Sequence, residues 1–317
     1  MKSIEIDVVV PVFNGEQYLA DALRSIQKQT LPASRIIVAD DGSSDRTVDV
    51  AKSFMESDSR ISYLKLPHKG VSAARNAGIS ASKAPFIAFL DADDIWLPTK
   101  LECQAEVFGR AASDVGFVHS SYFCINADGE LATNQYVVPP KKRGDIFLPL
   151  LIESYVLSGS ASSVLVRRDV LDSAGHFDEQ LFHGEDWDLW IRLAKISKVD
   201  FTPQAVVGIR IHNESAQRRV QRGRALKFFQ QQMRVYSKWE AAVRADNRFE
   251  RSLRRAAIDA ILPSIKKPSI VHEFYRSFAT NENALVRSIF PNQLHFWAEI
   301  CFGIIKILVK RIKGRFA

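Results

Sequence analysis

The sequence predicts an α/β fold with a mostly parallel central sheet flanked by helices, followed by a helical C-terminal region. Residues 1–110 alternate β-branched runs with segments of helical spacing. Strands that are joined through helices pair in parallel and are covered on both faces. From about residue 215 the pattern is helical and basic. With 317 residues, 46% of them hydrophobic, the chain can form one large domain with an appendage, or two domains.

Strands and helices are expected to alternate through residues 1–110. The expected strands are the apolar runs at 7–13, 35–40, 61–66 and 85–92. The expected helices fill the segments at 15–29, 44–54 and 70–82, with Ser44 as the N-cap of the second. In such sheets ligands bind beyond the carboxyl ends of the strands. Four polar residues are placed at these ends: Asn14, Asp40, Asp41 and Asp91.

The middle of the chain is predicted to mix helices with further strands. Strands are expected at 116–130 (with a turn), at 160–168, and at 205–212, where the strand ends in His212. Helices are expected at 144–154 and 184–196, the second of them amphipathic.

Charge and cysteine content limit the function classes. The net charge of +7 would suit nucleic acid, anionic lipid or a phosphorylated ligand. No recognised nucleic-acid motif accompanies the charge, so nucleic acid is not an expected partner. Cys103, Cys124 and Cys301 form no CxxC pair, which disfavours a zinc site or disulfide framework and fits a reducing cytoplasm. The N-terminal apolar run is short and interrupted by acidic residues, so no signal peptide is expected.

The apolar run at 86–90 ends abruptly in Asp91, Asp93 and Asp94. Crowded carboxylates repel one another and are costly to desolvate. An extended backbone would place Asp91 and Asp93 on one face, where they could hold a hard divalent cation together with water and ligand phosphates. The alternative is a solvated turn in which Asp94 caps the helix that Pro98 begins.

A second acidic strand end lies in the segment 38–47. Asp40 or Asp41 could accept a hydrogen bond from a ring N–H of a nucleobase, and Gly42 would permit the tight turn that follows. The alternative is an Asp-Gly turn that leads into a capped helix. Arg75 offers a fixed cation beside these carboxylates, or else is a surface arginine on a helix.

Two further acidic residues and a histidine complete the candidate residues. Glu185 and Asp186 lie in the first turn of the helix expected at 184–196. Either could act as a general base, which must reach a hydroxyl proton and be ionised at the working pH. The alternative is N-terminal capping, because the helix dipole favours carboxylates there. His212 is either a metal or phosphate ligand or a structural histidine.

The order and spacing of these motifs resemble the inverting family 2 glycosyltransferases of the GT-A fold. The segments that carry the resemblance are VVVPVFNGEQYL, VADDGSSDRT, VSAARNAGI, FLDADD, GHFDEQLFHGEDWDLWIRL and RIHNES. The resemblance covers residues 5–215. It implies a GT-A catalytic domain at 1–215, with a nucleotide-sugar-binding half at about 1–110 and an acceptor-binding half at about 111–215. The helical basic region at 216–317 lies outside it.

The resemblance implies a nucleotide-sugar site at the strand ends. Asp41 would contact the uracil ring of a UDP-sugar, with Arg75 close to the nucleotide and Asp91 near the ribose. The remaining residues that it implies for this site are Pro11, Val12, Phe13, Asn14, Asp40 and Ala92.

The resemblance also implies a metal site and a catalytic base. Asp93, together with Asp91 and His212, would hold the divalent cation, Mg²⁺ or Mn²⁺, that bridges the diphosphate. Asp186 would be the base, with Glu185 as the less favoured choice.

The implied function is metal-dependent inverting transfer of a sugar from a UDP-sugar to an acceptor hydroxyl. The acceptor would be a carbohydrate or a lipid-linked saccharide in bacterial surface polysaccharide or lipopolysaccharide biosynthesis. The alternative is a non-catalytic membrane-docking or assembly subunit with a transferase-like domain. A dinucleotide-dependent oxidoreductase would need GxGxxG where this chain has VFNGEQ. A sugar nucleotidyltransferase would need a glycine-rich, basic N-terminal loop.

The segment at 294–316 is predicted to rest on a membrane surface and not to cross it. On a helix its polar residues form one narrow stripe beside a wide apolar face: His295, Glu299, Lys306, Lys310 and Lys313. A spanning helix needs ~20 mostly apolar residues, whereas an interfacial helix tolerates such lysines. The alternative is packing of the apolar face on the catalytic domain or on a second copy, as in a homodimer. The expected location is therefore cytoplasmic, peripheral on the inner face of the plasma membrane.

Overall fold

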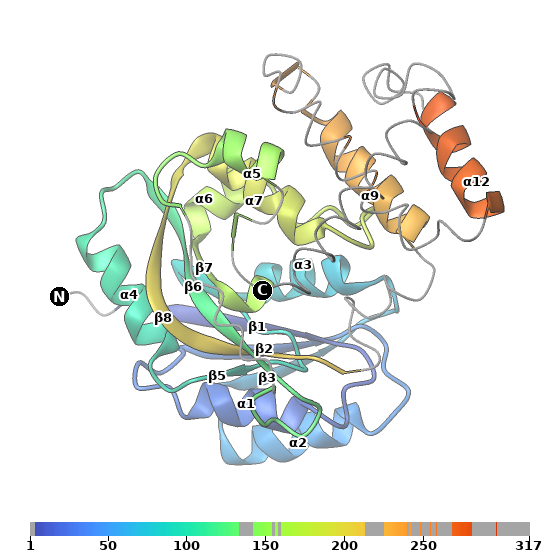
Figure 1. The fold of residues 1–317 in the computed structure, drawn as a ribbon. Coiled ribbons are helices and arrows are strands. Elements are labelled where there is room, and N and C mark those ends of the chain that lie inside the picture. Colours follow the sequence, from blue (N-terminus) through green and yellow to red (C-terminus); the bar gives the residue numbers. More distant parts are fainter. Residues whose placement is uncertain are drawn as a thin grey trace, which may run out of the picture. The chain divides into compact units, whose positions relative to one another are not determined.

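The computed structural model describes residues 4–132, 142–153, 156–157, 160–212, 225–239 and 268–280, with isolated positions at 241–242, 248, 254, 258 and 296. The chain divides into two compact units. The first unit comprises Met1–Leu150 and Ser154–His212, and the second comprises Leu151–Glu153 and Asn213–Ala317. The first unit holds a large curled sheet flanked by helices (Figure 1), so the predicted α/β class is confirmed.

Within the described residues the sheet has eight strands in the order β3-β2-β1-β4-β7-β6-β8-β5. The first four pair in parallel. They are β1 (Ile6–Val12), β2 (Arg35–Asp40), β3 (Ile61–Lys65) and β4 (Phe86–Phe89). Every residue of β1 is buried. Its apolar run from Val8 to Val12, in place of an alternating pattern, is what a parallel strand covered on both faces requires.

The second half of the sheet is mixed. β7 (Val164–Arg167) lies antiparallel between β4 and β6 (Val115–Ile125). β8 (Lys198–Arg210) pairs in parallel with β6, and the short β5 (Ile95–Trp96) pairs antiparallel with β8. β8 starts at Lys198 and not at the predicted residue 205. The polar stretch before residue 205 has no strand pattern in the sequence, but pairing with β6, in an irregular register, holds it in the strand.

Helices cover both faces of the parallel strands. α1 (Leu19–Gln27) and α2 (Thr47–Ser57) lie on one face and α3 (Val71–Ala81) on the other (Figure 1). The predicted N-cap Ser44 is wrong, because α2 begins at Thr47, whose N–H donates to Asp45 Oδ1 at 3.0 Å. The remaining helices of the described residues are α4 (Lys100–Arg110), α5 (Phe147–Glu153), η1 (Ala161–Ser163), α6 (Arg168–Ala174), α7 (Glu185–Ile196), α9 (Ala225–Ser237) and α12 (Pro268–Ala279).

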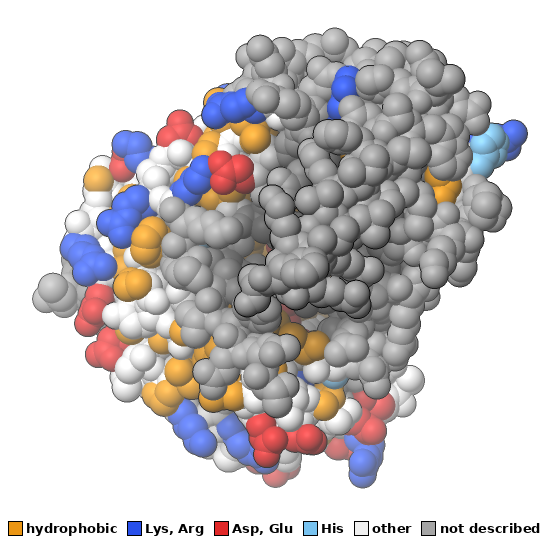
Figure 2. Space-filling model, in the orientation of Figure 1, with side chains coloured by type: hydrophobic (Ala, Val, Ile, Leu, Met, Phe, Trp, Pro, Cys, Tyr) orange, Lys and Arg blue, Asp and Glu red, His pale blue; other side chains and the backbone are white. Residues whose placement is uncertain are grey.

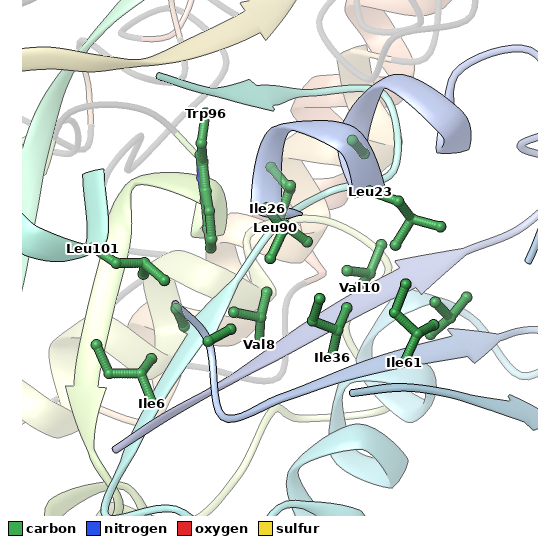
Figure 3. Close-up of a cluster of buried hydrophobic side chains, with 14 of the residues drawn as sticks. Ile6, Val8, Val10, Leu23, Ile26, Ile36, Ile61, Leu90, Trp96 and Leu101 are labelled. Atoms are coloured by element: carbon green, nitrogen blue, oxygen red, sulfur yellow. The ribbon is translucent and has the colours of Figure 1, made fainter. Parts of the chain in front are cut away.

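A buried apolar cluster holds the parallel strands against α1 (Figure 3). β1 contributes Ile6, Val8 and Val10, and α1 contributes Leu23 and Ile26. The other labelled members are Ile36, Ile61, Leu90, Trp96 and Leu101. Because removing such side chains from water drives folding, this cluster fixes where the strands end and therefore where the polar strand-end residues lie.

α3 packs unusually close to β1 at Gly78. A Cβ on Gly78 would lie 2.3 Å from Cγ1 of Val9, so only glycine fits. This close approach sets the position of Arg75, which lies one turn earlier on the same buried side of α3. Gly109 of α4 is also helical, but an added Cβ would meet nothing within 4 Å there.

These two glycines give a matched stability test. We expect Gly78→Ala to lower the free energy of unfolding by about 1–3 kcal/mol, because the core at Val9 must shift to admit the methyl group. Gly109→Ala should raise it by roughly 0.5–1 kcal/mol, since alanine is the better residue in an open helical position. Urea unfolding followed by circular dichroism measures both values. A Gly78→Ala variant as stable as the unchanged protein would contradict the close packing of α3.

The predicted membrane-surface segment at 294–316 lies outside the described residues except for Phe296. The ring centroid of Phe296 is 5.3 Å from that of Tyr275 on α12. Among the residues that the structure describes, no helix is both long and apolar enough to cross a bilayer.

The surface of the described residues carries charges of both signs. On the described part of the face in Figure 2, acidic and basic side chains are interspersed.

Candidate active site

The end of β1 forms the first part of the candidate site. Phe13, just past the strand, is 48% exposed. Asn14 adopts a left-handed backbone with φ of 50°, a conformation that asparagine tolerates better than most residues. Its N–H donates to Ser43 Oγ at 2.8 Å, and its side-chain oxygen accepts the Ser44 N–H at 2.9 Å. Asn14 therefore joins the end of β1 to the loop that follows β2.

An exposed aromatic pair lies at this strand end. The ring of Phe13 stacks on that of His68, with centroids 4.2 Å apart and an interplanar angle of 21°. His68 Nδ1 lies 2.8 Å from Asp41 Oδ2, which fixes the imidazole. Sequence reasoning missed His68, although its place just after the third strand at the same sheet edge was a usable signal.

Asp40 and Asp41 are buried, and their carboxylates already accept hydrogen bonds from neighbouring loops. Asp40 accepts from the N–H of Ser43 at 2.8 Å. Asp41 accepts from the N–H groups of Lys69 at 2.7 Å and Gly70 at 2.9 Å. These bonds stabilise the rim of the strand-end site. The expected contact of Asp41 with a nucleobase stays a prediction.

Arg75 joins two predicted site residues from distant parts of the chain. Its Nη2 lies 2.7 Å from Asp91 Oδ1, and its Nη1 lies 2.8 Å from Glu185 Oε1. The residue is 3% exposed, so the alternative of a surface arginine is wrong. Its contacts are with these carboxylates and not with those of Asp40 and Asp41. Burial disfavours the guanidinium charge, but the charges of Asp91 and Glu185 outweigh burial and raise the pKa of Arg75.

The aspartates after β4 lie in a turn and not on an extended backbone. The Asp94 N–H donates to the Asp91 carbonyl at 3.0 Å. The turn directs Asp91 to Arg75 and Asp93 to His212, whose Nε2 is 3.0 Å from Asp93 Oδ2. The prediction that Asp91 and Asp93 share one face of an extended strand is therefore wrong, because this hydrogen bond closes the chain directly after the strand.

Asp94 is the anchor of this turn. Its carboxylate accepts from Ser162 Oγ at 2.6 Å, Ser160 Oγ at 3.2 Å and the Arg210 N–H at 3.0 Å. It does not cap the following helix, which begins at Lys100. Burial, followed by the charges of the other two carboxylates of the turn, raises the pKa of Asp94 well above its usual range. Asp94 thus links the turn to η1 and to the end of β8.

The start of α7 presents the two candidate bases. Gly184 precedes the helix in a left-handed conformation with φ of 75°, which turns the chain sharply into Glu185 and Asp186. Glu185 is held by Arg75 at 2.8 Å. Burial, and next the charge of Glu185, raise the pKa of Asp186 to about 7, against the opposing effect of Arg75. A carboxyl with a pKa near neutrality is suited to proton transfer.

The predicted metal ligands are only partly gathered. Within the described residues, no group of three His, Cys, Asp or Glu side chains is arranged to hold a metal ion. Asp93 and His212 do lie together, and the Asp93 side chain is 36% exposed. One carboxylate and one imidazole fit a divalent cation whose other positions are filled by water and phosphate oxygens. Asp91 is engaged by Arg75 instead.

Arg210 is a second residue that sequence reasoning missed. Its Nε donates to the Asp93 carbonyl at 2.8 Å, and its Nη1 donates to the Ala127 carbonyl at 2.8 Å. Its position two residues before His212, at the end of a strand, was the available signal.

Comparison with known proteins places this arrangement in a family. The family model for glycosyl transferase family 2 matches residues 7–172, more than half of the chain. An uncharacterized glycosyltransferase of Rickettsia prowazekii, RP339, is 29% identical over 212 residues, which are 65% of this chain and 64% of that protein. The chain thus spans less than two thirds of the length of that relative.

Two further comparisons are informative. The Escherichia coli enzyme named UDP-Glc:alpha-D-GlcNAc-diphosphoundecaprenol beta-1,3-glucosyltransferase WfgD is 30% identical over 195 residues, which are 61% of this chain and 71% of that protein. Among solved structures, residues 1–349 of S. aureus TarS with UDP-GlcNAc superpose with a TM-score of 0.57 at 19% identity, covering 87% of this chain and 73% of that one. That structural likeness supports the GT-A fold. The chain belongs to glycosyl transferase family 2.

Proposed function

We propose that the chain is a metal-dependent inverting glycosyltransferase that moves a sugar from a UDP-sugar to an acceptor hydroxyl. The observation that carries this proposal is the bridge through Arg75. One buried guanidinium ties Asp91, at the strand-end nucleotide side, to Glu185 beside Asp186, with distances of 2.7 and 2.8 Å. This bridge supports a single site that combines the proposed donor-side and base-side carboxylates.

Asp186 is proposed as the base that accepts the proton of the acceptor hydroxyl. Glu185 is held by Arg75 at 2.8 Å, so its carboxylate is already engaged and is less available to an acceptor hydroxyl. The pKa of Asp186 is raised to about 7 by burial and by the charge of Glu185. A base on the face of the sugar opposite the leaving group makes the attack inverting, and general base catalysis contributes typically about 10²–10⁴-fold.

Asp93 and His212 are proposed to hold the cation. When bound, Mg²⁺ or Mn²⁺ supplies positive charge that stabilises the charge developing on the leaving diphosphate. The 3.0 Å separation of Asp93 Oδ2 and His212 Nε2 supports this pairing. The chain's own part is to present the carboxylate and imidazole together at the end of the sheet.

The donor is proposed to be a UDP-sugar whose base lies near Phe13. Phe13 is 48% exposed and its ring is held parallel to that of His68 at 4.2 Å, so it offers an aromatic face at the strand end. Structures of TarS, which has a similar fold, were obtained with UDP and with UDP-GlcNAc. A saccharide acceptor, lipid-linked as in the name of WfgD, and a role in bacterial surface polysaccharide or lipopolysaccharide synthesis belong to the same proposal.

A panel of nucleotide sugars tests the reaction. The protein is incubated with UDP-, GDP- and dTDP-sugars and a mixture of saccharide and lipid-linked saccharide acceptors, with Mn²⁺, with Mg²⁺ or with excess chelator. We expect UDP release from one or more UDP-sugars, dependent on the metal. Absence of turnover across the panel would favour the alternative of a non-catalytic docking subunit. Turnover that is equal with added metal and with excess chelator would rule out metal dependence.

We also propose that the segment at 294–316 docks on anionic membrane. Its lysine stripe and wide apolar face support docking, and a lipid-linked acceptor would make it useful. In flotation with anionic liposomes, the full-length chain should float, and changing Lys306, Lys310 and Lys313 to Glu should abolish flotation. The same charge change at three exposed lysines of the first unit is the matched control: Lys52, Lys65 and Lys83. If the two variants float equally, the lysines of this segment do not mediate docking, and we would assign the segment to packing on protein instead.

A further inference from the structure

Arg210 ends β8 and is buried beside the turn that carries Asp93. Its side chain is 1% exposed. The planar guanidinium donates through Nε to the Asp93 carbonyl and through Nη1 to the Ala127 carbonyl, both at 2.8 Å. Its Nη2 lies 3.3 Å from Asp21 Oδ2 on α1. One side chain therefore joins three segments that are far apart in the sequence.

The backbone of Arg210 completes the hold on the turn. Its N–H donates to Asp94 Oδ1 at 3.0 Å. The main chain of Asp93 and the side chain of Asp94 are thus both fixed by the same residue. Two positions later the chain reaches His212, whose Nε2 lies 3.0 Å from Asp93 Oδ2. Arg210 therefore constrains both residues of the Asp93–His212 pair. It holds Asp93 through hydrogen bonds to the turn, and it constrains His212 because the two residues are only two positions apart on the backbone.

The guanidinium also has an aromatic neighbour that limits its movement. Its central carbon lies 4.7 Å from the ring centroid of Tyr18, and the Tyr18 ring lies 5.1 Å from that of His212. Stacking against an aromatic face is favourable for a guanidinium. Tyr18 thus contacts both Arg210 and His212, so that the arginine, the ring and the imidazole form one packed group.

We propose that Arg210 is a positioning residue that sets the geometry of the Asp93–His212 pair for a divalent cation, an inference that rests on the proposed metal-dependent function. Because its side chain is 1% exposed, we assign it no direct contact with substrate or metal. Its effect passes through the Asp93 backbone and the position of His212. Partners that orient metal ligands commonly affect metal affinity by about 10–100-fold when they are replaced.

Lysine cannot take over this role. Arginine presents five N–H donors in a planar fork, whereas lysine carries one nitrogen at the end of a flexible stem. A lysine at position 210 keeps the charge near Asp21 and a stem against Tyr18. It cannot donate to the carbonyls of Asp93 and Ala127 from two fixed nitrogens at once. Arg210→Lys therefore separates positioning from charge.

Arg192 of α7 provides a matched control. It is also a largely buried arginine, with Nε 3.0 Å from Asp188 Oδ2 and Nη groups that donate to the carbonyls of Ala174 at 2.8 Å and His176 at 2.7 Å. It clamps backbone in the same way as Arg210, but none of these contacts involves the turn that carries Asp93. Arg192→Lys therefore measures how Mn²⁺ binding and stability respond to the loss of a guanidinium whose role is structural.

The test measures Mn²⁺ binding to the full-length chain with UDP present, by electron paramagnetic resonance, together with the melting temperature. Arg210→Lys should weaken Mn²⁺ binding about 10–100-fold, and Arg192→Lys should leave it unchanged. In an Asp93→Ala background, Arg210→Lys should cause no further loss, because interacting residues are not additive.

The outcomes separate this inference from the proposed function. If Asp93→Ala binds Mn²⁺ as the unchanged protein does, the metal assignment fails, and the inference fails with it. If Asp93→Ala loses Mn²⁺ but Arg210→Lys does not, only the positioning role of Arg210 is overturned. Unfolding of Arg210→Lys, or an equal loss of Mn²⁺ in Arg192→Lys, would assign Arg210 a purely structural role and would also overturn the inference.

Discussion

Asp186→Asn is expected to lower kcat at least ~10²-fold while leaving binding of the UDP-sugar largely intact. Asparagine keeps the shape of the side chain but cannot accept a proton, and general base catalysis contributes on this scale. Steady-state kinetics at a fixed metal concentration give kcat, and calorimetric titration with UDP gives donor affinity. A drop in affinity as large as the drop in kcat would mean that Asp186 binds the donor instead.

Glu185→Gln is the matched control for this prediction. Glu185 is held by Arg75, so its replacement should cost less activity than that of Asp186. If Glu185→Gln is inactive and Asp186→Asn is near normal, then the roles of the two residues are reversed.

The pH dependence of activity is a second test of Asp186 as the base. Burial, and next the charge of Glu185, raise the pKa of Asp186 to about 7, and only the ionised form can act as a base. Activity should therefore rise with pH up to about 7 and level off above it. Glu185→Gln removes a negative neighbour, so the rise should move to lower pH. An unchanged pH profile in Glu185→Gln would argue that a group other than Asp186 controls the rate.

Asp93→Ala is expected to abolish activity and leave the fold intact. The Asp93 side chain is 36% exposed and contacts His212, so its loss removes a proposed metal ligand without opening the core. Activity with Mg²⁺ and Mn²⁺ and the melting temperature are measured together. Asp128→Ala is the control, since Asp128 is an exposed acidic residue in another turn. Full activity of Asp93→Ala in the presence of a chelator would reject the metal assignment.

The parallel strands of the first half of the sheet could be predicted because the apolar pattern of each strand lies within its own segment of the sequence. Continuous apolar runs such as Val8 to Val12 of β1 are buried on both faces, and recognising them needs no long-range information. The placement of Asn14, Asp40, Asp41 and Asp91 at strand ends followed from the same pattern. β7 runs antiparallel to β4, and the sequence of a short apolar strand does not encode its direction.

The electrostatics of the site were not predictable in the same way. Arg75 meets Asp91 from 16 residues away and Glu185 from 110 residues away. Such pairings depend on how closely α3 packs on β1 at Gly78 and on where α7 begins. The turn that separates Asp91 from Asp93 depends on a local backbone hydrogen bond and on anchors from η1 and β8. Spacing of acidic residues alone suggested an extended pair.

The stereochemistry of the transferred sugar tests the central claim most directly. An α-linked UDP-sugar that turns over in the donor panel is supplied with its acceptor, and proton NMR records the anomeric configuration of the first product formed. A base at Asp186, acting on the face opposite the leaving diphosphate, predicts a β-linked product. An α-linked product would contradict single-displacement inversion and with it the role proposed for Asp186.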